Sequence, residues 1–100
     1  MDQLKAALAY QPVSVTIEAD KDVFRAYKSG ILDDASCGTS LDHAALLVGW
    51  GYDDGLKKDF WLVKNSWNTT WGDNGYIRLA IADGEGICGI QMEPQTVTSN

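Results

Sequence analysis

The stretch Asp42–Gly51 reads DHAALLVGWG and is almost continuously apolar over the length of a strand. Such a run is typical of a strand that is buried on both faces of a sheet. A charged stretch around Asp54-Gly55, residues 52–59, comes next and predicts a hairpin loop. A second apolar run, FWLVKNS at Phe60–Ser66, then predicts the partner strand. These two runs place a β-hairpin at the centre of the fold.

Further strands and short helices flank this hairpin in the sequence. The alternating patterns VSVTIE at 13–18 and YIRLAI at 76–81 predict two half-buried strands. Helical spacing of apolar residues predicts short helices over 2–10 and 19–29, the second with Asp20 as its N-cap. Turn residues predict loops at 29–39 and 67–75, and the polar tail after Glu93 is expected to lie along the surface. The predicted fold class is α+β, with a small antiparallel, barrel-like sheet and short helices.

Length and charge limit the range of functions. The chain has 100 residues, of which 45% are hydrophobic and 22% charged, so we expect one globular domain over residues 1–100. Its net charge is −6 and no stretch is basic, which argues against binding to nucleic acid or to an anionic membrane surface. No apolar run approaches the roughly 20 residues of a membrane span. We therefore expect neither nucleic acid nor membrane among the partners.

The chain has two cysteines, Cys37 and Cys88, and a single histidine, His43. These are too few ligands for a zinc site, and we expect no metal and no cofactor. A disulfide between the cysteines would close a loop of about 50 residues and contribute roughly 4 kcal/mol to stability. Two buried free thiols in a cytosolic protein are the other interpretation, and the spacing leaves both open.

His43 begins the central strand, and Asn65 ends the next one. A histidine that acts as a general base needs a hydrogen-bond partner for its second ring nitrogen, and a side-chain amide can supply one. Taken alone, however, His43 is better interpreted as a structural histidine and Asn65 as a turn residue. Trp67 and Trp71 follow in a glycine-rich loop, where exposed indoles are costly, so we expect them to cover something.

Several motifs occur together in one order: QPVSVTIEA, LDHAALLVGWG, FWLVKNSW, WGDNGYIRL and GICGI. Over residues 4–92 they resemble the C-terminal half of papain-like cysteine proteases of the cathepsin and plant papain type. That family has a helical N-terminal lobe and a barrel-like C-terminal lobe, with the active site in the cleft between them. The resemblance implies that this chain is the C-terminal lobe and that the N-terminal lobe is absent from it.

The resemblance implies a catalytic role for four matching residues. His43 matches the catalytic histidine, which forms a thiolate–imidazolium pair with the nucleophilic cysteine. Asn65 matches the amide that orients this imidazole, and Trp67 matches the indole that shields their hydrogen bond from water. Asp42 matches a residue beside the histidine that tunes the site without being required.

Substrate contacts and a disulfide follow from the same resemblance. The implied substrate-binding residues are Thr16, Ala44, Trp71 and Glu93. Glu93 matches the floor of the S2 pocket, where a carboxylate can pair with Arg as well as turn away from Leu or Phe. A surface glutamate shifted out of register by Pro94 is the alternative. Cys37 and Cys88 match a disulfide within the lobe.

The nucleophile is missing from the match. In this family it lies roughly 130 residues before the histidine, in a C-G-[SA]-C-[WY] signature, and only 42 residues precede His43. We therefore expect the chain alone to be inactive, with the N-terminal lobe and peptide or protein substrates as partners, and with a cleft face able to self-associate. The alternatives are a non-catalytic pseudo-protease fragment, an isolated folding or binding domain, or a carbohydrate-binding domain that uses Trp67 and Trp71.

Asn68 departs from the family pattern, which usually has glycine at this position. Asparagine tolerates a left-handed backbone, so the loop can keep its path. The change also creates a possible glycosylation site, Asn68-Thr69-Thr70. An unmodified loop is the favoured alternative, because a glycan here would sit beside the primed side of the cleft that the resemblance implies. Membership of this family would imply a lysosomal, vacuolar or secreted location for the parent enzyme. We expect the targeting signal for that location to lie outside these residues.

Overall fold

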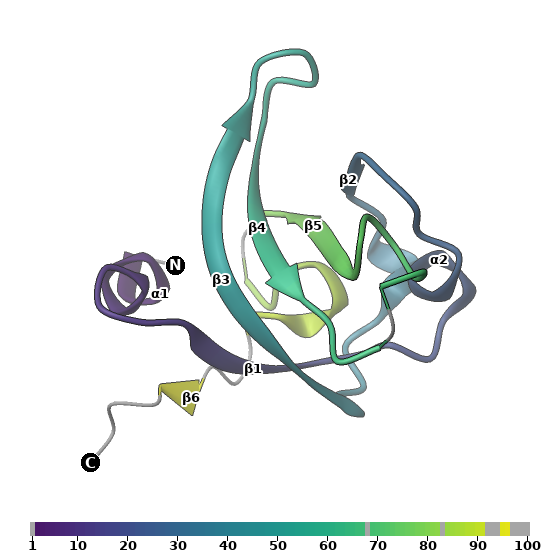
Figure 1. Cartoon of the computed structure of the whole chain (residues 1–100), viewed down its shortest axis with the longest axis horizontal. Helices are drawn as coiled ribbons and strands as arrows, with labels where there is room; N and C mark the ends of the chain where they lie inside the picture. Colours follow the sequence, from purple (N-terminus) through teal and green to yellow (C-terminus); the bar gives the residue numbers. More distant parts are fainter. Residues whose placement is uncertain (1, 68, 83, 92–94, 97–100) are drawn as a thin grey trace.

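A strongly curved six-stranded sheet organises the chain in this computed structural model, which describes residues 2–67, 69–82, 84–91 and 95–96 (Figure 1). The strands lie in the order β2-β5-β4-β3-β1-β6. Their bounds are β1 Val13–Ile17, β2 Ile31–Leu32, β3 His43–Asp53, β4 Lys58–Lys64, β5 Tyr76–Ala80 and β6 Gln95–Thr96. Two α-helices, α1 Asp2–Leu8 and α2 Asp22–Arg25, and two 3₁₀ turns, Ala35–Cys37 and Ile87–Gly89, accompany the sheet. The α+β class predicted from the sequence is confirmed.

The core lies on one face of this sheet. Val13, Val15 and Ile17 point inward from β1, as their alternation with polar residues predicts. They meet fully buried side chains from β3, β4, β5, α2 and the C-cap of the last 3₁₀ turn, namely Leu47, Trp61, Val63, Ile77, Leu79, Phe24 and Ile90. The β2–β5 pair is parallel, whereas all other pairs are antiparallel, so the sheet is mixed rather than purely antiparallel.

The central strand β3 differs from the prediction that it is buried on both faces. Ala45 and Leu47 are buried, but Trp50 is 50% exposed. The reason is that β1 pairs with β3 only as far as Leu47, where β3 has an irregularity in its register with β4. Beyond this point β3 pairs with β4 alone, and Figure 1 shows the two strands curving away together as a projecting hairpin.

The helix predicted over 19–29 is reduced to the four residues of α2. Asp20 is not its N-cap, which is a correction to the sequence prediction: the N-cap is Lys21, without a side-chain cap hydrogen bond. Ala19 is held in the sheet region because its N–H donates to Asp42 Oδ1 at 2.9 Å. Residues 29–39, predicted as a loop, contain β2 and the first 3₁₀ turn, and β6 in the tail pairs with β1.

Gly38 is required by both its backbone and its surroundings, and this gives a testable stability prediction. Its φ is +85°, and a Cβ added there would lie 2.2 Å from Glu18 Oε1. Gly30 has a similar φ of +81° but nothing within 4 Å of an added Cβ. We expect Gly30→Ala to lower the free energy of unfolding by about 1 kcal/mol through backbone strain, and Gly38→Ala by about 2–4 kcal/mol because steric overlap is added. Urea denaturation of both variants measures the difference, and equal losses would mean that the overlap is relieved without cost.

Candidate active site

His43 and Asn65 lie side by side at one end of the β3–β4 pair. Because these strands are antiparallel, the start of β3 lies beside the end of β4, with Leu46 opposite Lys64. His43 Nε2 lies 2.7 Å from Asn65 Oδ1. An amide oxygen only accepts hydrogen bonds, so Nε2 carries the proton of the neutral ring and Nδ1 is left as the basic nitrogen. The structure thus brings together the two residues that the sequence places at the ends of separate strands.

Trp67 packs against His43 and is itself packed by Phe24 and Trp71. The Trp67 ring lies 5.3 Å from the His43 ring, centroid to centroid. Trp67 packs edge-on against Phe24 and against Trp71, which also stacks on Phe24 at 5.0 Å and donates from Nε1 to Arg25 O at 3.0 Å. Trp67 and Trp71 are therefore half-buried by packing within the chain. This packing within the chain explains how a glycine-rich loop can carry two indoles, and no bound ligand is needed to cover them.

Two hydrogen bonds join Asp42 to the last residue of β1 and to Ala19, two residues further on. Its Oδ1 accepts from Ala19 N–H, and its own N–H donates to Ile17 O at 3.0 Å. A pocket of about 160 Å³ opens beside it, lined by Ala19, Asp20, Arg25, Asp42, His43 and Trp67. A reacting group in this pocket would lie against the histidine ring, since the ring forms part of the wall.

Thr16 and Ala44 lie opposite each other in the β1–β3 register. Ala44 is exposed and lines a second open pocket of about 340 Å³, together with Ser14, Ala45, Leu46, Lys64, Asn65 and Ser66. Asn65 is only 4% exposed, yet its Nδ2 has no hydrogen-bond partner among the residues that the structure describes. A buried donor without an acceptor costs folding free energy.

The remaining predicted positions have different outcomes. Cys37 and Cys88 form a disulfide, with sulfurs 2.05 Å apart, so the pairing implied by the resemblance is present. Trp71 lies beside Trp67, as described above. Glu93 and the possible glycosylation site at Asn68 fall outside the described residues.

The buried carboxylate of Glu18 was missed by the sequence analysis, although it lies close to this site. Glu18 is 1% exposed, and its Oε1 accepts from Ser40 N–H at 2.7 Å while Oε2 pairs with Lys21 Nζ at 2.5 Å. Hydrogen bonds with Asp20, with Lys21 and with the Ser40 amide lower the pKa of Glu18 to about 2. The hydrogen bond with Glu18 raises the pKa of Asp20 in turn.

These pKa shifts predict how stability depends on pH. The pKa of Glu18 falls from 4.5 to about 2 on folding, so its stabilising effect is complete above pH 4.5 and is lost as the pH falls through 2. The raised pKa of Asp20 opposes this effect. We expect the difference in unfolding free energy between the wild type and Glu18→Gln to stay constant from pH 6 to about pH 4.5 and to shrink from there to pH 2. Urea midpoints across this range measure it, and a constant difference would show that Glu18 has an ordinary pKa in the folded chain.

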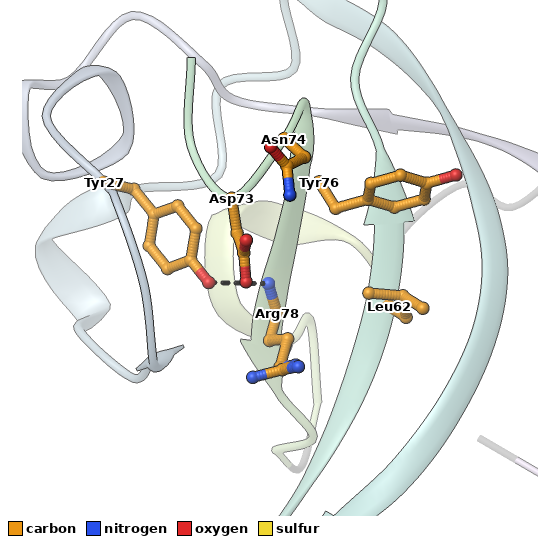
Figure 2. A pocket seen from close by; sticks show the side chains of 6 residues that line it. All are labelled: Tyr27, Leu62, Asp73, Asn74, Tyr76 and Arg78. Atoms are coloured by element: carbon orange, nitrogen blue, oxygen red, sulfur yellow. Dashed lines mark hydrogen bonds between the residues drawn. The ribbon is translucent and has the colours of Figure 1, made fainter. Parts of the chain in front are cut away.

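A further pocket, of about 280 Å³, contains none of the predicted site residues (Figure 2). Its lining is Tyr27, Leu62, Asp73, Asn74, Tyr76 and Arg78. The Tyr27 hydroxyl donates to Gly30 O at 2.6 Å and accepts from the Arg78 backbone N–H at 3.4 Å, so it links α2's C-terminal side to β5. Burial raises the pKa of Tyr27. Its hydroxyl is already hydrogen-bonded within the chain, and we assign the pocket no role in catalysis.

Residues 2–67, 69–82, 84–91 and 95–96 hold no group of three His, Cys, Asp or Glu side chains placed to bind a metal ion. None of the helices in this part of the chain has the length and apolar character needed to cross a bilayer.

Comparisons with known proteins identify the family of this chain. The papain family cysteine protease model matches residues 1–98. Cysteine proteinase RD21A of Arabidopsis thaliana is 48% identical over 101 residues, which cover 99% of this chain and 21% of that protein. Germination-specific cysteine protease 1, from the same plant, is 50% identical over 93 residues, which cover 90% of this chain and 24% of that protein. The chain thus spans about a quarter of the length of these relatives.

Solved structures show the same fold. The bromelain protease of Ananas comosus, determined in complex with the E64 inhibitor, superposes with a TM-score of 0.86 and 40% identity, over 95% of this chain and 44% of that chain. The proform of the ragweed pollen allergen Amb a 11, a cysteine protease, superposes with a TM-score of 0.87 and 36% identity, over 95% of this chain and 29% of that chain. The family model covers nearly every residue, and the chain therefore belongs to the papain family of cysteine proteases.

Proposed function

We propose that this chain is the C-terminal half of a papain-like cysteine endopeptidase and that His43 and Asn65 are its catalytic imidazole and the amide that positions it. The observation that carries this proposal is the 2.7 Å contact between His43 Nε2 and Asn65 Oδ1. This contact leaves Nδ1 free to exchange a proton with a thiol. Trp67, 5.3 Å from the imidazole between ring centroids, excludes water and so strengthens the hydrogen bond.

The reaction that this arrangement supports is acyl transfer through a thioester. His43 Nδ1 takes the proton of a cysteine thiol, and the thiolate sulfur attacks the scissile carbonyl carbon. The C–N bond breaks as the imidazolium returns its Nδ1 proton to the leaving amine. Water then attacks the thioester while Nδ1 takes a proton from it, the C–S bond breaks, and the thiolate and the carboxylic acid product are released.

The nucleophile has to come from outside these 100 residues, because the disulfide occupies both cysteines of the chain. We assign it to an N-terminal lobe that packs over the open pocket next to Asn65. This pocket supports the assignment, because it is open and Asn65 forms part of its lining. Without that lobe we expect no peptidase activity, and we expect the uncovered face to self-associate at high concentration.

Substrate contacts are proposed for four residues, which are Thr16, Ala44, Trp71 and Glu93. Thr16 and Ala44 are neighbours across β1 and β3, beside the first residue of β3, His43. Glu93 is proposed as the floor of the S2 pocket, where it admits Arg in addition to apolar side chains. For the parent enzyme we propose a lysosomal, vacuolar or secreted location, which the disulfide supports because such bonds persist in oxidising compartments.

A chimeric protease tests the proposed function. In it, residues 1–100 of this chain replace the corresponding segment of cysteine proteinase RD21A, which is 48% identical. We expect the purified chimera to hydrolyse a fluorogenic peptide at a rate within about tenfold of RD21A, whereas the isolated chain has no activity above buffer. A folded chimera without activity, or an isolated chain that cleaves the peptide, would contradict the proposal.

A further inference from the structure

Residues 37–42 connect the disulfide to the proposed catalytic histidine. Cys37, the first residue of this segment, is fixed by its disulfide bond to Cys88. His43 comes directly after Asp42, the last residue of the segment, and pairs with Ile17 between β1 and β3. The five residues after Cys37 form no regular secondary structure. The place of His43 in the site therefore depends on what holds residues 38–42.

Three consecutive residues at the end of β1 hold this segment. Ile17 O accepts from Asp42 N–H at 3.0 Å, and Ala19 N–H donates to Asp42 Oδ1 at 2.9 Å. Between these two residues, the Glu18 side chain reaches further along the segment, and its Oε1 accepts from Ser40 N–H at 2.7 Å. Glu18 is thus the contact that fixes the middle of the segment, since Ile17 and Ala19 both bind Asp42 at its end.

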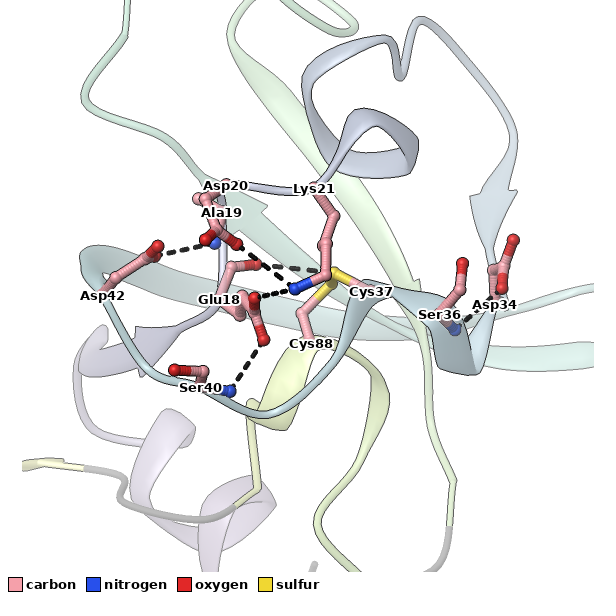
Figure 3. The surroundings of a disulfide bond; sticks show 10 residues. All are labelled: Glu18, Ala19, Asp20, Lys21, Asp34, Ser36, Cys37, Ser40, Asp42 and Cys88. Atoms are coloured by element: carbon pink, nitrogen blue, oxygen red, sulfur yellow. Dashed lines mark hydrogen bonds and ion pairs between the residues drawn. A yellow bond between two sulfur atoms is a disulfide. The ribbon is translucent and has the colours of Figure 1, made fainter.

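The surroundings of Glu18 are built around its carboxylate. The side chain is 1% exposed, and its backbone N–H donates to Cys88 O at 2.8 Å, so it is attached to the disulfide as well. Figure 3 shows the carboxylate between Lys21 and Ser40. Gly38 leaves room for it, because a Cβ there would lie 2.2 Å from Oε1. A buried carboxylate with a cation on one oxygen and a backbone N–H on the other has a fixed orientation.

We propose that Glu18 is a positioning residue for catalysis: through Ser40 it holds residues 38–42 so that the His43 imidazole stays on Asn65. This role rests on the proposed function of His43. The carboxylate touches neither substrate nor the imidazole, so its effect is transmitted along the backbone from Ser40 to His43. A merely stabilising carboxylate would affect the unfolding free energy and leave the imidazole of the folded chain unchanged.

A matched pair of variants isolates the contact with Ser40. Glu18→Gln/Lys21→Met keeps an oxygen acceptor for the Ser40 N–H, whereas Glu18→Met/Lys21→Met has no acceptor there but similar volume and the same net charge. His43 is the only histidine, so selective ¹⁵N-histidine labelling reports this ring alone. We expect the Gln variant to retain the slowly exchanging Nε2–H of the wild type, and the Met variant to exchange it at least tenfold faster. Equal exchange rates in the two folded variants would overturn the proposal.

A milder variant keeps the proposal testable should the Met variant not fold. Glu18→Asp retains the charge but shortens the side chain by one methylene, which withdraws the acceptor from Ser40. We expect it to show the same faster Nε2–H exchange, and a wild-type rate in folded Glu18→Asp would overturn the proposal. In the chimeric protease the Met variant should lose about tenfold in kcat relative to the Gln variant, with KM unchanged. The exchange measurement does not depend on enzymatic activity. Failure of the positioning role can therefore be distinguished from failure of the proposed function.

Discussion

Replacing His43 by alanine in the chimeric protease should lower kcat/KM by about 10⁴-fold or more. In the proposed reaction the imidazole activates the thiol and then protonates the leaving amine, so its loss would remove both general-base and general-acid catalysis. In enzymes whose nucleophile and base act as a unit, removal of the base costs nearly as much as removal of the nucleophile. Steady-state hydrolysis of the fluorogenic peptide measures this effect.

Two further substitutions make the His43 result specific. Asn65→Ala should cost about 10²-fold, because the imidazole remains but its orientation is no longer fixed. Leu56→Ala serves as the control, since Leu56 is 52% exposed and lies in the loop between β3 and β4, at the far end of the hairpin from His43. It should leave the rate unchanged. A His43→Ala chimera that keeps more than a tenth of the wild-type rate would rule out the assigned role.

Removing the disulfide should lower the free energy of unfolding by about 4 kcal/mol. The bond joins residues 51 positions apart, and closing a loop of this size restricts the unfolded chain by about that amount. The loss is large for a small domain, whose total stability is about 5–15 kcal/mol. The comparison is the urea midpoint of Cys37→Ala/Cys88→Ala against the wild type, at a pH where both are folded.

Reductant gives the control for the disulfide prediction. It should lower the midpoint of the wild type and leave that of the double variant unchanged. In the folded, unreduced chain an alkylating reagent should label neither cysteine. Labelling of Cys37 or Cys88 before reduction, or a wild-type midpoint that ignores reductant, would contradict a stabilising disulfide.

The elements with strong periodic patterns were predictable from the sequence. The alternation of VSVTIE predicts β1, and the two apolar runs predict β3 and β4 as partners. Their antiparallel pairing is enough to bring the start of one strand near the end of the other, and hence His43 near Asn65. The family motifs added the disulfide, which spacing alone left open.

Other features depend on tertiary contacts that no local pattern reveals. Strand β2 has only two residues, and it forms because it pairs with β5. Trp50 continues an apolar run but is half exposed, because β1 ends before reaching it. Glu18 stands at a polar position in the alternating pattern VSVTIE, which predicts that its side chain is exposed. It is buried instead, because Lys21 and the Ser40 N–H both bind its carboxylate.

The most direct test of the account is the ¹⁵N spectrum of the single histidine in the isolated, folded chain. We expect the neutral ring to carry its proton on Nε2, this proton to exchange slowly, and Asn65→Ala to make the exchange fast. That result would show that Asn65 fixes the tautomer and leaves Nδ1 as the base. A ring protonated on Nδ1, or an Nε2–H whose exchange is the same in Asn65→Ala, would contradict the central claim that this pair is built for thiol catalysis.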